Sequence, residues 1–229
     1  AAPDPALLTG QRLRDALAAR GVTITGAIRR GVAPADAREI AHVDSPPLSN
    51  IVGEMLRGSD NYTAEELLRD IAAGTSGGNG ATTYAGTQIV AATLSRLGVP
   101  TDGLDLHDGS GLAPDDRVGC PTLLGVINRS TAAPLTAIDA GLPVAGRSGT
   151  LAEAFGGTPL AGRLRAKTGS IDGVVGLTGV VDGSVRPTFA FLANGRLSES
   201  TGVALQAAIA AAVAAYPDTR QPQLVVPRP

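Results

Sequence analysis

Two Asp-Gly pairs, Asp172-Gly173 and Asp182-Gly183, restrict the fold of this chain more than any other feature of its sequence. They separate three runs of strand-like sequence, residues 165–170, 174–181 and 188–192. An Asp-Gly pair between two such runs is typical of a tight hairpin, because both residues accept the positive φ that the turn requires. The sequence therefore predicts a three-stranded antiparallel meander.

Helical patterns precede and follow this meander. Apolar residues recur at helical spacing in four segments, residues 5–20, 49–56, 84–97 and 121–128. Thr63 followed by Glu66 forms a capping-box pattern and predicts the start of a further helix. An Ala-rich stretch, residues 200–216, predicts a closing helix that Pro217 ends.

Shorter segments complete the expected organisation. Residues 22–28 and 104–107 have the pattern of short strands, and the glycine-rich residues 74–80 predict a loop. Helices before and after an antiparallel meander indicate an α/β fold of the α+β kind. We expect its helices to pack on one or both faces of the sheet.

The composition excludes several classes of function. The chain has 229 residues, with 19 Lys and Arg against 21 Asp and Glu, so it has no basic excess for binding nucleic acid. No run of about 18 apolar residues occurs, so no transmembrane segment is expected. A single cysteine, Cys120, excludes an internal disulfide, and two isolated histidines, His42 and His107, argue against a metal site.

Only one of the 19 basic residues is a lysine, Lys167, so any chemistry that needs a lysine in this chain must use it. It begins the segment Lys167-Thr168-Gly169-Ser170 on the first strand of the predicted meander. A second polar segment, Ser59-Asp60-Asn61, stands upstream between two predicted helices. Each segment alone is ordinary strand or turn sequence, but together they indicate acyl transfer.

The segment that begins at Lys167 has the properties of a substrate-binding strand. Strand geometry places Thr168 and Ser170 on one face, where two hydroxyls can bind one carboxylate, and the ammonium of Lys167 supplies the attracting charge. Gly169 has no side chain, so a substrate backbone can approach closely and pair with the strand as an added strand would.

The Ser59-Asp60-Asn61 segment supplies complementary groups from the opposite wall. The Ser59 hydroxyl can relay a proton to a leaving amine. The Asn61 amide can hold a substrate carbonyl and the lysine partner of a nucleophile. The predicted cleft is therefore helical on one side and formed by a sheet edge on the other.

Both segments match known motifs. Ser59-Asp60-Asn61 resembles the second motif, and Lys167-Thr168-Gly169 the third motif, of the penicillin-recognising serine DD-peptidases. Within that superfamily the chain resembles the D-alanyl-D-alanine carboxypeptidases/endopeptidases of the penicillin-binding protein 4 (DacB, peptidase S13) type. Further matching segments follow the family order: Ser45-Pro46-Pro47-Leu48-Ser49, Asp108-Gly109-Ser110-Gly111-Leu112 with Arg117-Val118, Leu142-Pro143-Val144-Ala145-Gly146 and Ser148-Gly149-Thr150-Leu151.

The resemblance implies the fold of the DD-peptidases and β-lactamases, a five-stranded antiparallel sheet flanked by helices with an all-helical lobe. Residues 1–229 would form the C-terminal portion of a penicillin-binding transpeptidase-like domain and would lack part of the fold. The helical lobe would span about residues 45–160, and the sheet with its closing helix about residues 161–217.

The resemblance also implies a function. The family's enzymes are serine-type D-Ala-D-Ala carboxypeptidases, or DD-endopeptidases, that act on peptidoglycan stem peptides ending in D-Ala-D-Ala and are acylated by β-lactams. They work outside the cytoplasmic membrane, in the periplasm or cell wall, and no metal or organic cofactor is implied. By this resemblance the catalytic residues are Ser59, Asn61 and Lys167, and the substrate-binding residues are Thr168, Gly169 and Ser170.

The chain departs from the family at its first motif, Ser-x-x-Lys, in which the serine attacks and the lysine takes its proton. The residue three places before Lys167 is Leu164, so the motif is absent. We expect the nucleophile on an N-terminal segment that is missing or belongs to a separate chain. The chain alone would then be inactive and would expose apolar edges and an unpaired strand. The alternative is a catalytically inactive relative that binds peptidoglycan or acts as a scaffold.

A remote alternative is an esterase-like hydrolase built on Ser76. Gly74-Thr75-Ser76-Gly77-Gly78 has the pattern of a nucleophile elbow, and Asp102 or Asp105 followed by His107 completes the order Ser, Asp, His. A nucleophile elbow must leave a buried strand, whereas a predicted helix precedes this segment. The context therefore disfavours the esterase.

Overall fold

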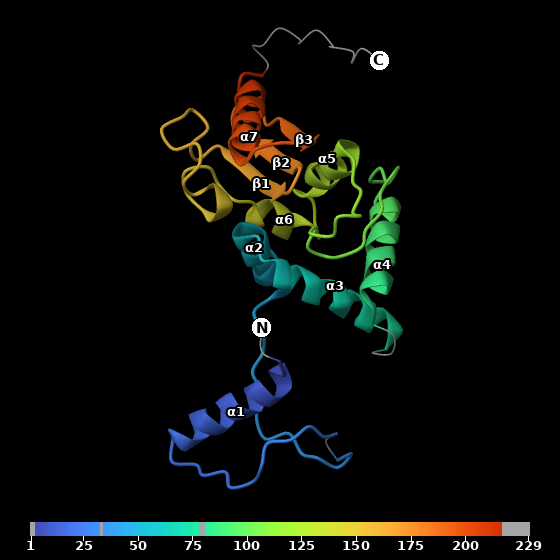
Figure 1. Ribbon diagram of the computed structural model, residues 1–229, viewed down its shortest axis with the longest axis vertical. Coiled ribbons are helices and arrows are strands. Elements are labelled where there is room, and N and C mark those ends of the chain that lie inside the picture. Colours follow the sequence, from blue (N-terminus) through green and yellow to red (C-terminus); the bar gives the residue numbers. More distant parts are fainter. Residues whose placement is uncertain (1–2, 33, 78–80, 217–229) are drawn as a thin grey trace. The chain divides into compact units, whose positions relative to one another are not determined.

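The computed structural model of the chain describes residues 3–32, 34–77 and 81–216 (Figure 1). The chain divides into two compact units, Ala1–Ser45 and Pro46–Pro229. Every residue of the predicted site belongs to the second unit. Within the described ranges, no helix is both long and apolar enough to cross a membrane.

The first unit contains helix α1 (Pro5–Ala18), as the sequence predicts. Asp4 caps its start by accepting a hydrogen bond from the Leu7 amide at 3.1 Å, and the Arg30 guanidinium binds the same carboxylate. The predicted strand at residues 22–28 is wrong, since the structure has neither helix nor strand there. No other described segment of this unit forms a strand, and an extended segment without a partner cannot build a ladder.

A three-stranded antiparallel sheet in the order β1-β2-β3 confirms the predicted meander. Its strands are β1 (Leu164–Ile171), β2 (Val174–Val181) and β3 (Thr188–Asn194). Across β1 and β2, Lys167 pairs with Thr178 and Thr168 pairs with Leu177. Because paired residues share a face and neighbours along a strand do not, Lys167 and Thr168 lie on opposite faces.

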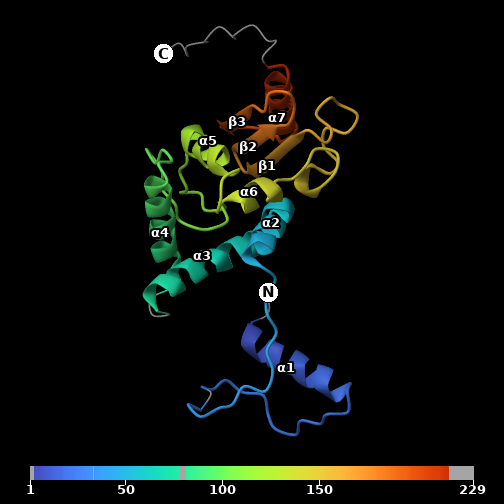
Figure 2. The ribbon, with the colours of Figure 1, turned by 180° about the vertical axis from the view of Figure 1, so that it is seen from behind.

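Helices cover both faces of this sheet (Figure 1 and Figure 2). On one face α7 (Glu199–Ala214) buries Ala210 in a core cluster with Leu177 of β2. On the other face α5 (Cys120–Arg129) packs Ile127 against Val180 of β2. Lys167 shares the α5 face, because its partner Thr178 lies two residues from Val180.

The remaining helices form a lobe beside the sheet. They are α2 (Leu48–Gly58), α3 (Asn61–Ser76), α4 (Thr83–Arg96), α6 (Thr136–Gly141) and the short 3-10 helix η1 (Gly149–Leu151). The structure confirms the predicted helices near residues 49–56, 84–97, 121–128 and 200–216. Helix α6 was not predicted, because its six residues are too few for a periodic pattern.

Three local predictions need correction. Asp60, not Thr63, caps α3, so that helix begins nearly one turn earlier than the capping-box pattern indicates. Because α3 continues to Ser76, it replaces the first part of the predicted loop, and residues 78–80 of that loop lie outside the described residues. Residues 104–107 form no strand, only an isolated bridge between Asp105 and Arg117.

Candidate active site

The C-terminal end of α2 presents Ser59. This residue has φ 54° and ψ 48°, the left-handed conformation that few residues other than glycine adopt. Its amide donates to the Met55 carbonyl, which ends the helix. Backbone strain of this kind persists where the surrounding structure imposes it, and it is concentrated at functional sites.

The other two residues of the motif lie at the start of α3. The Asp60 carboxylate caps the helix by accepting hydrogen bonds from the Tyr62 and Thr63 amides at 2.9 and 3.3 Å and from the Thr63 hydroxyl at 2.8 Å. These bonds, above all the one from the Thr63 hydroxyl, lower the pKa of Asp60. Asn61 is the first residue of α3 and is exposed. Asp60 therefore has a structural role, whereas the side chains of Ser59 and Asn61, on either side of it, are the candidates for catalysis.

The tertiary structure brings Lys167 to Ser59 across a sequence separation of 108 residues. The Lys167 Nζ donates to the Ser59 Oγ at 2.7 Å and to the Thr168 carbonyl oxygen at 2.8 Å. Burial lowers the pKa of Lys167, because its charged form loses water. A lysine with a lowered pKa beside a serine hydroxyl can exchange a proton with it.

The hydroxyl-bearing residues occupy the opposite face of β1. Thr168 and Ser170 lie two positions apart on this strand, as predicted, and so share a face. The Thr168 hydroxyl donates to the hydroxyl of Thr150, in η1, at 2.9 Å. Thr150 was not predicted as a site residue, and its one signal in the sequence is its place in the Ser148-Gly149-Thr150-Leu151 segment.

The outer edge of β1 has a covered half and an open half. Residues 143–145 pair with its beginning, where the Ala145 amide donates to the Leu164 carbonyl at 2.9 Å. Alternate residues point their backbone groups to the same edge, so the amides and carbonyls of Thr168 and Ser170 also face outward. The described residues contain no strand that pairs with this second half. An extended peptide can add there as a further strand.

A cavity of about 410 Å³ opens beside the end of β1, between residues 111–118 and the strands. Asp116 lies in its wall and accepts a hydrogen bond from the His107 amide at 2.7 Å. Burial, and next the adjacent carboxylate of Asp108, raise the pKa of Asp116. The pKa of Asp108 is lowered in spite of its burial, because hydrogen bonds including that from the Gly111 amide favour its charged form. Of the two acids, Asp116 takes up a proton first.

Three apolar cavities, of about 540, 520 and 350 Å³, lie among the lobe helices and between the lobe and the sheet. Val126 of α5 and Ile138 of α6 line all three, so the cavities adjoin, and we call them together the apolar groove. Its smallest part reaches Lys167 and Gly169. The groove is partly open to solvent and lined mainly by apolar side chains, so it has room for a further apolar element.

The structure contradicts the hypothesis that Ser76 is the nucleophile of an esterase-like hydrolase. This residue is the last of α3, and its hydroxyl donates to the Ala72 carbonyl at 2.9 Å. A nucleophile elbow requires a turn from a strand into a helix, whereas Ser76 ends a helix. His107 does approach Asp105, at 3.3 Å, but both side chains are well exposed.

Comparisons with known proteins agree with the motifs. The model of the D-Ala-D-Ala carboxypeptidase 3 (S13) family matches residues 1–216. The D-alanyl-D-alanine carboxypeptidase of Actinomadura sp. (strain R39) is 37% identical over 229 residues, covering 96% of this chain and 42% of the relative. Carboxypeptidase DacB of Mycolicibacterium smegmatis is 36% identical over 202 residues, covering 83% of this chain and 42% of the relative. The chain thus spans less than half the length of these curated relatives.

Crystal structures of penicillin binding protein 4 (dacB) from Haemophilus influenzae have a similar fold. One, complexed with a novel β-lactam, has a TM-score of 0.75 and 24% identity and covers 91% of this chain and 51% of that chain. A second has a TM-score of 0.70 and 26% identity and covers 83% of this chain and 43% of that chain. These structures confirm the predicted fold class, to which the described residues contribute three antiparallel strands.

Proposed function

Because the chain belongs to the D-Ala-D-Ala carboxypeptidase 3 (S13) family, we propose that it forms the substrate-binding and proton-transfer part of a serine-type D-Ala-D-Ala carboxypeptidase. Its substrates are peptidoglycan stem peptides that end in D-Ala-D-Ala, and β-lactams are its covalent inhibitors. The site of action is outside the cytoplasmic membrane, in the periplasm or cell wall, where peptidoglycan lies.

The observation that carries this proposal is the hydrogen bond of 2.7 Å between Lys167 Nζ and Ser59 Oγ. It unites the Ser-x-Asn segment of the lobe with the Lys-Thr-Gly strand of the sheet. The left-handed backbone of Ser59 and the partial burial of Lys167 both lower the stability of the fold. Their contact places a hydroxyl beside an ammonium, an arrangement suited to the proton transfer of an acyl-transfer reaction.

Substrate binding is assigned to the open half of the β1 edge. The stem peptide pairs with the outward backbone groups of Thr168 and Ser170 as an added strand. Its terminal carboxylate accepts hydrogen bonds from the Ser170 hydroxyl and from the Thr168 hydroxyl, which turns to it from Thr150, the group to which it donates in the free chain. Gly169 is exposed and without a side chain, so it leaves room for the peptide.

Ser59 and Lys167 are assigned to proton transfer. When the serine nucleophile attacks, its own proton passes to the lysine of the Ser-x-x-Lys motif, and an ester bond forms between the serine oxygen and the substrate carbonyl carbon. The peptide C–N bond breaks, and the departing D-Ala amine takes the hydroxyl proton of Ser59. The Lys167 ammonium returns a proton to Ser59, and its lowered pKa makes it a better donor. Asn61, exposed at the first turn of α3, donates its amide to the substrate carbonyl.

The nucleophile itself comes from a segment outside this chain. The chain has no Ser-x-x-Lys motif and spans 42% of the length of the Actinomadura relative. The apolar groove supports this part of the proposal, because it reaches Lys167 and has room for an apolar helix. A helix seated there would lie next to Lys167, the hydrogen-bond partner of Ser59.

The absence of the Ser-x-x-Lys motif also favours a second candidate, a catalytically inactive relative that binds peptidoglycan. Such a protein would keep the substrate-binding strand β1 and lose acylation. The two candidates differ in one measurable property, since only the first is acylated by a β-lactam when a family segment with the nucleophile is supplied.

Labelling with a fluorescent penicillin separates these candidates. The probe is applied to the chain alone and to a chimera in which this chain replaces the matching part of the Actinomadura carboxypeptidase. We expect label on the chimera only, and Ser59→Ala or Lys167→Met in the chimera should slow labelling by a factor on the order of 10²–10⁴. Asp115→Asn, an exposed change, serves as the control. A folded chimera that binds peptidoglycan but takes no label would establish the inactive relative instead.

A further inference from the structure

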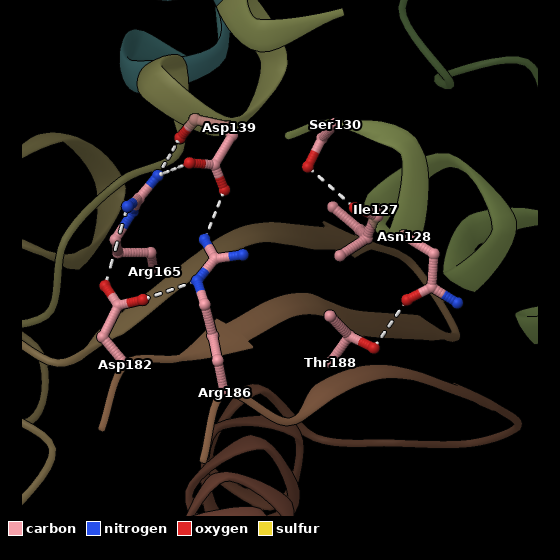
Figure 3. Close-up of polar contacts among 8 residues, drawn as sticks. All are labelled: Ile127, Asn128, Ser130, Asp139, Arg165, Asp182, Arg186 and Thr188. Carbon is pink, nitrogen blue, oxygen red and sulfur yellow. Dashed lines mark hydrogen bonds and ion pairs between the residues drawn. The ribbon is translucent and has the colours of Figure 1, made fainter. Parts of the chain in front are cut away.

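Asp139 of α6 joins two parts of the sheet region (Figure 3). One carboxylate oxygen accepts a hydrogen bond from Arg165 of β1, and the other accepts one from Arg186, between β2 and β3, at 2.6 Å. The Asp139 backbone carbonyl also accepts from Arg165. Asp182 closes the ring by pairing with Arg186 at 2.8 Å and with Arg165 at 3.6 Å.

This network is more sheltered than an ordinary surface ion pair. The side chains of Asp139 and Arg165 are only 19% and 22% exposed. Although burial opposes its ionisation, the hydrogen bonds from Arg186 and Arg165 lower the pKa of Asp139, so its carboxylate stays charged at neutral pH. A charged, doubly bound carboxylate of this kind holds its neighbours in a defined geometry.

The same helix α6 is in direct backbone contact with α2. A Cβ atom on Gly141 would lie 2.8 Å from the Cα of Gly53, closer than real side chains allow, whereas a Cβ on Gly53 would lie 3.8 Å from the Cα of Gly141. With no side chain between them, the two helices pack backbone against backbone at this crossing, and close packing transmits a displacement of α6 to α2. Asp139, two residues before Gly141, therefore holds α2 as well as α6.

α2 is connected to β1 by several routes, including the pairing of residues 143–145, which follow α6, with the beginning of β1. Two of these routes run through side chains near Lys167. The direct route is the Ser59–Lys167 hydrogen bond, since Ser59 ends α2. The second route runs from α2 through α6 and Asp139 to Arg165, which lies two residues before Lys167 on the same face of β1. This second route includes neither side chain of the proposed proton transfer.

We propose that Asp139 is a positioning residue that sets the distance between Ser59 and Lys167. It holds α6, and with it α2, against β1 through Arg165, and it touches neither substrate nor the reacting atoms. The consequence for catalysis rests on the proposed function, whereas the consequence for the surroundings of Lys167 does not.

A third contact limits the expected size of the effect. A Cβ on Gly149 of η1 would collide with the Arg57 carbonyl oxygen of α2, and the neighbouring Thr150 accepts a hydrogen bond from Thr168 of β1. η1 thus joins α2 to β1 as well. Loss of the Asp139 carboxylate should therefore loosen α2 and not detach it.

The single lysine allows a direct test. In the full chain, lysine labelled with ¹³C and ¹⁵N gives one side-chain NMR signal, and its titration reports the pKa of Lys167. Asp139→Asn should raise this pKa, because an ammonium released from Ser59 regains water. A purely electrostatic effect has the opposite sign, since removing a negative charge lowers the pKa of a lysine. A pKa that falls or stays unchanged would overturn the proposal, whatever happens to the melting temperature.

Matched variants at the helix crossing keep the test decisive if Asp139→Asn does not fold. Gly141→Ala changes no charge but forces α6 away from α2, so it should raise the Lys167 pKa in the same direction. Gly53→Ala adds the same methyl at an ordinary contact distance and should leave the titration unchanged. Equal titrations for these two variants would contradict the proposal.

Further variants separate positioning from general electrostatics and from the proposed function. Asp139→Glu restores the charge and should recover part of the wild-type titration. Arg69→Gln breaks the exposed pair with Glu66 and should have no effect. A chain that shows the expected titrations while the penicillin-labelled chimera fails would preserve this inference and contradict the proposed function.

Discussion

The Lys167 ammonium donates to the Ser59 hydroxyl at 2.7 Å, although the two residues are 108 positions apart. Ser59 stands at the end of α2 in a left-handed conformation, and Lys167 lies within β1. The bond therefore joins the helical half of the site to the sheet half.

Substitution of Lys167 by Met should change how stability depends on pH. The pKa of Lys167 is lowered in the folded protein, while the unfolded chain titrates near the ordinary value of 10.5. Between these two values the unfolded chain binds more protons, so the folded protein gains stability as pH rises. Below the folded pKa the full cost of burying the ammonium is present.

The free energy of unfolding, measured from neutral pH to about pH 10.5, checks this prediction. The wild-type stability should rise relative to that of Lys167→Met across the alkaline part of the range. Arg69→Met removes an exposed arginine, so the free energy of unfolding of this variant should depend on pH in the same way as that of the wild type. Parallel curves for wild type and Lys167→Met would show that the lysine titrates normally.

The left-handed backbone of Ser59 predicts an unusual order of stabilities. Ser59→Gly and Ser59→Ala both lose the hydrogen bond to Lys167, but only glycine relieves φ 54°. We expect the glycine variant to be more stable than the alanine variant by about 1 kcal/mol in urea unfolding. Ser130, whose φ is −65°, is the control: there the alanine variant should be more stable than the glycine variant. If glycine were the more stable variant at both sites, backbone strain at Ser59 would not be the cause.

Asp116→Asn should stabilise the protein at neutral pH. Burial and the nearby Asp108 carboxylate raise the pKa of Asp116 above 3.8, so its ionised form is unfavourable in the fold. The amide mimics the protonated acid and removes that cost. The gain should shrink as pH falls from the raised pKa towards 3.8 and vanish below 3.8, where the acid is protonated in both the folded and the unfolded state. Thermal unfolding across pH measures it, and the exposed Asp115→Asn should give no comparable gain.

The apolar groove predicts dye binding by the folded chain. Native protein should enhance the fluorescence of ANS, which binds exposed apolar surface, and Val126→Ser should reduce the signal because Val126 lines all three cavities. Val203→Ser, on α7 and 60% exposed, is the matched control. Fluorescence that appears only in acid or urea would mean that the groove is closed in solution.

Local sequence signals were sufficient for much of the fold. The Asp-Gly turns and β-forming runs predict the meander, and the bounds of β2 agree with residues 174–181. The Ser59-Asp60-Asn61 and Lys167-Thr168-Gly169 motifs could also be found in the sequence, because each is defined by residue identity over three adjacent positions. The strand predicted at residues 22–28 failed because a strand also needs a partner, which no local pattern provides.

Only the tertiary structure determined which side chains meet. The contacts of Ser59 with Lys167, of Thr150 with Thr168 and of Asp139 with Arg165 span 108, 18 and 26 positions. Each contact depends on how the helices pack against the sheet. That packing is determined by side-chain volumes and by how closely the backbones approach throughout the second unit. The sequence by itself determined the meander, most of the helices, the two polar motifs and the absence of the Ser-x-x-Lys motif. The packing of α2 and α6 against β1 determined the geometry of the site, because contacts between distant segments leave no periodic trace in the chain.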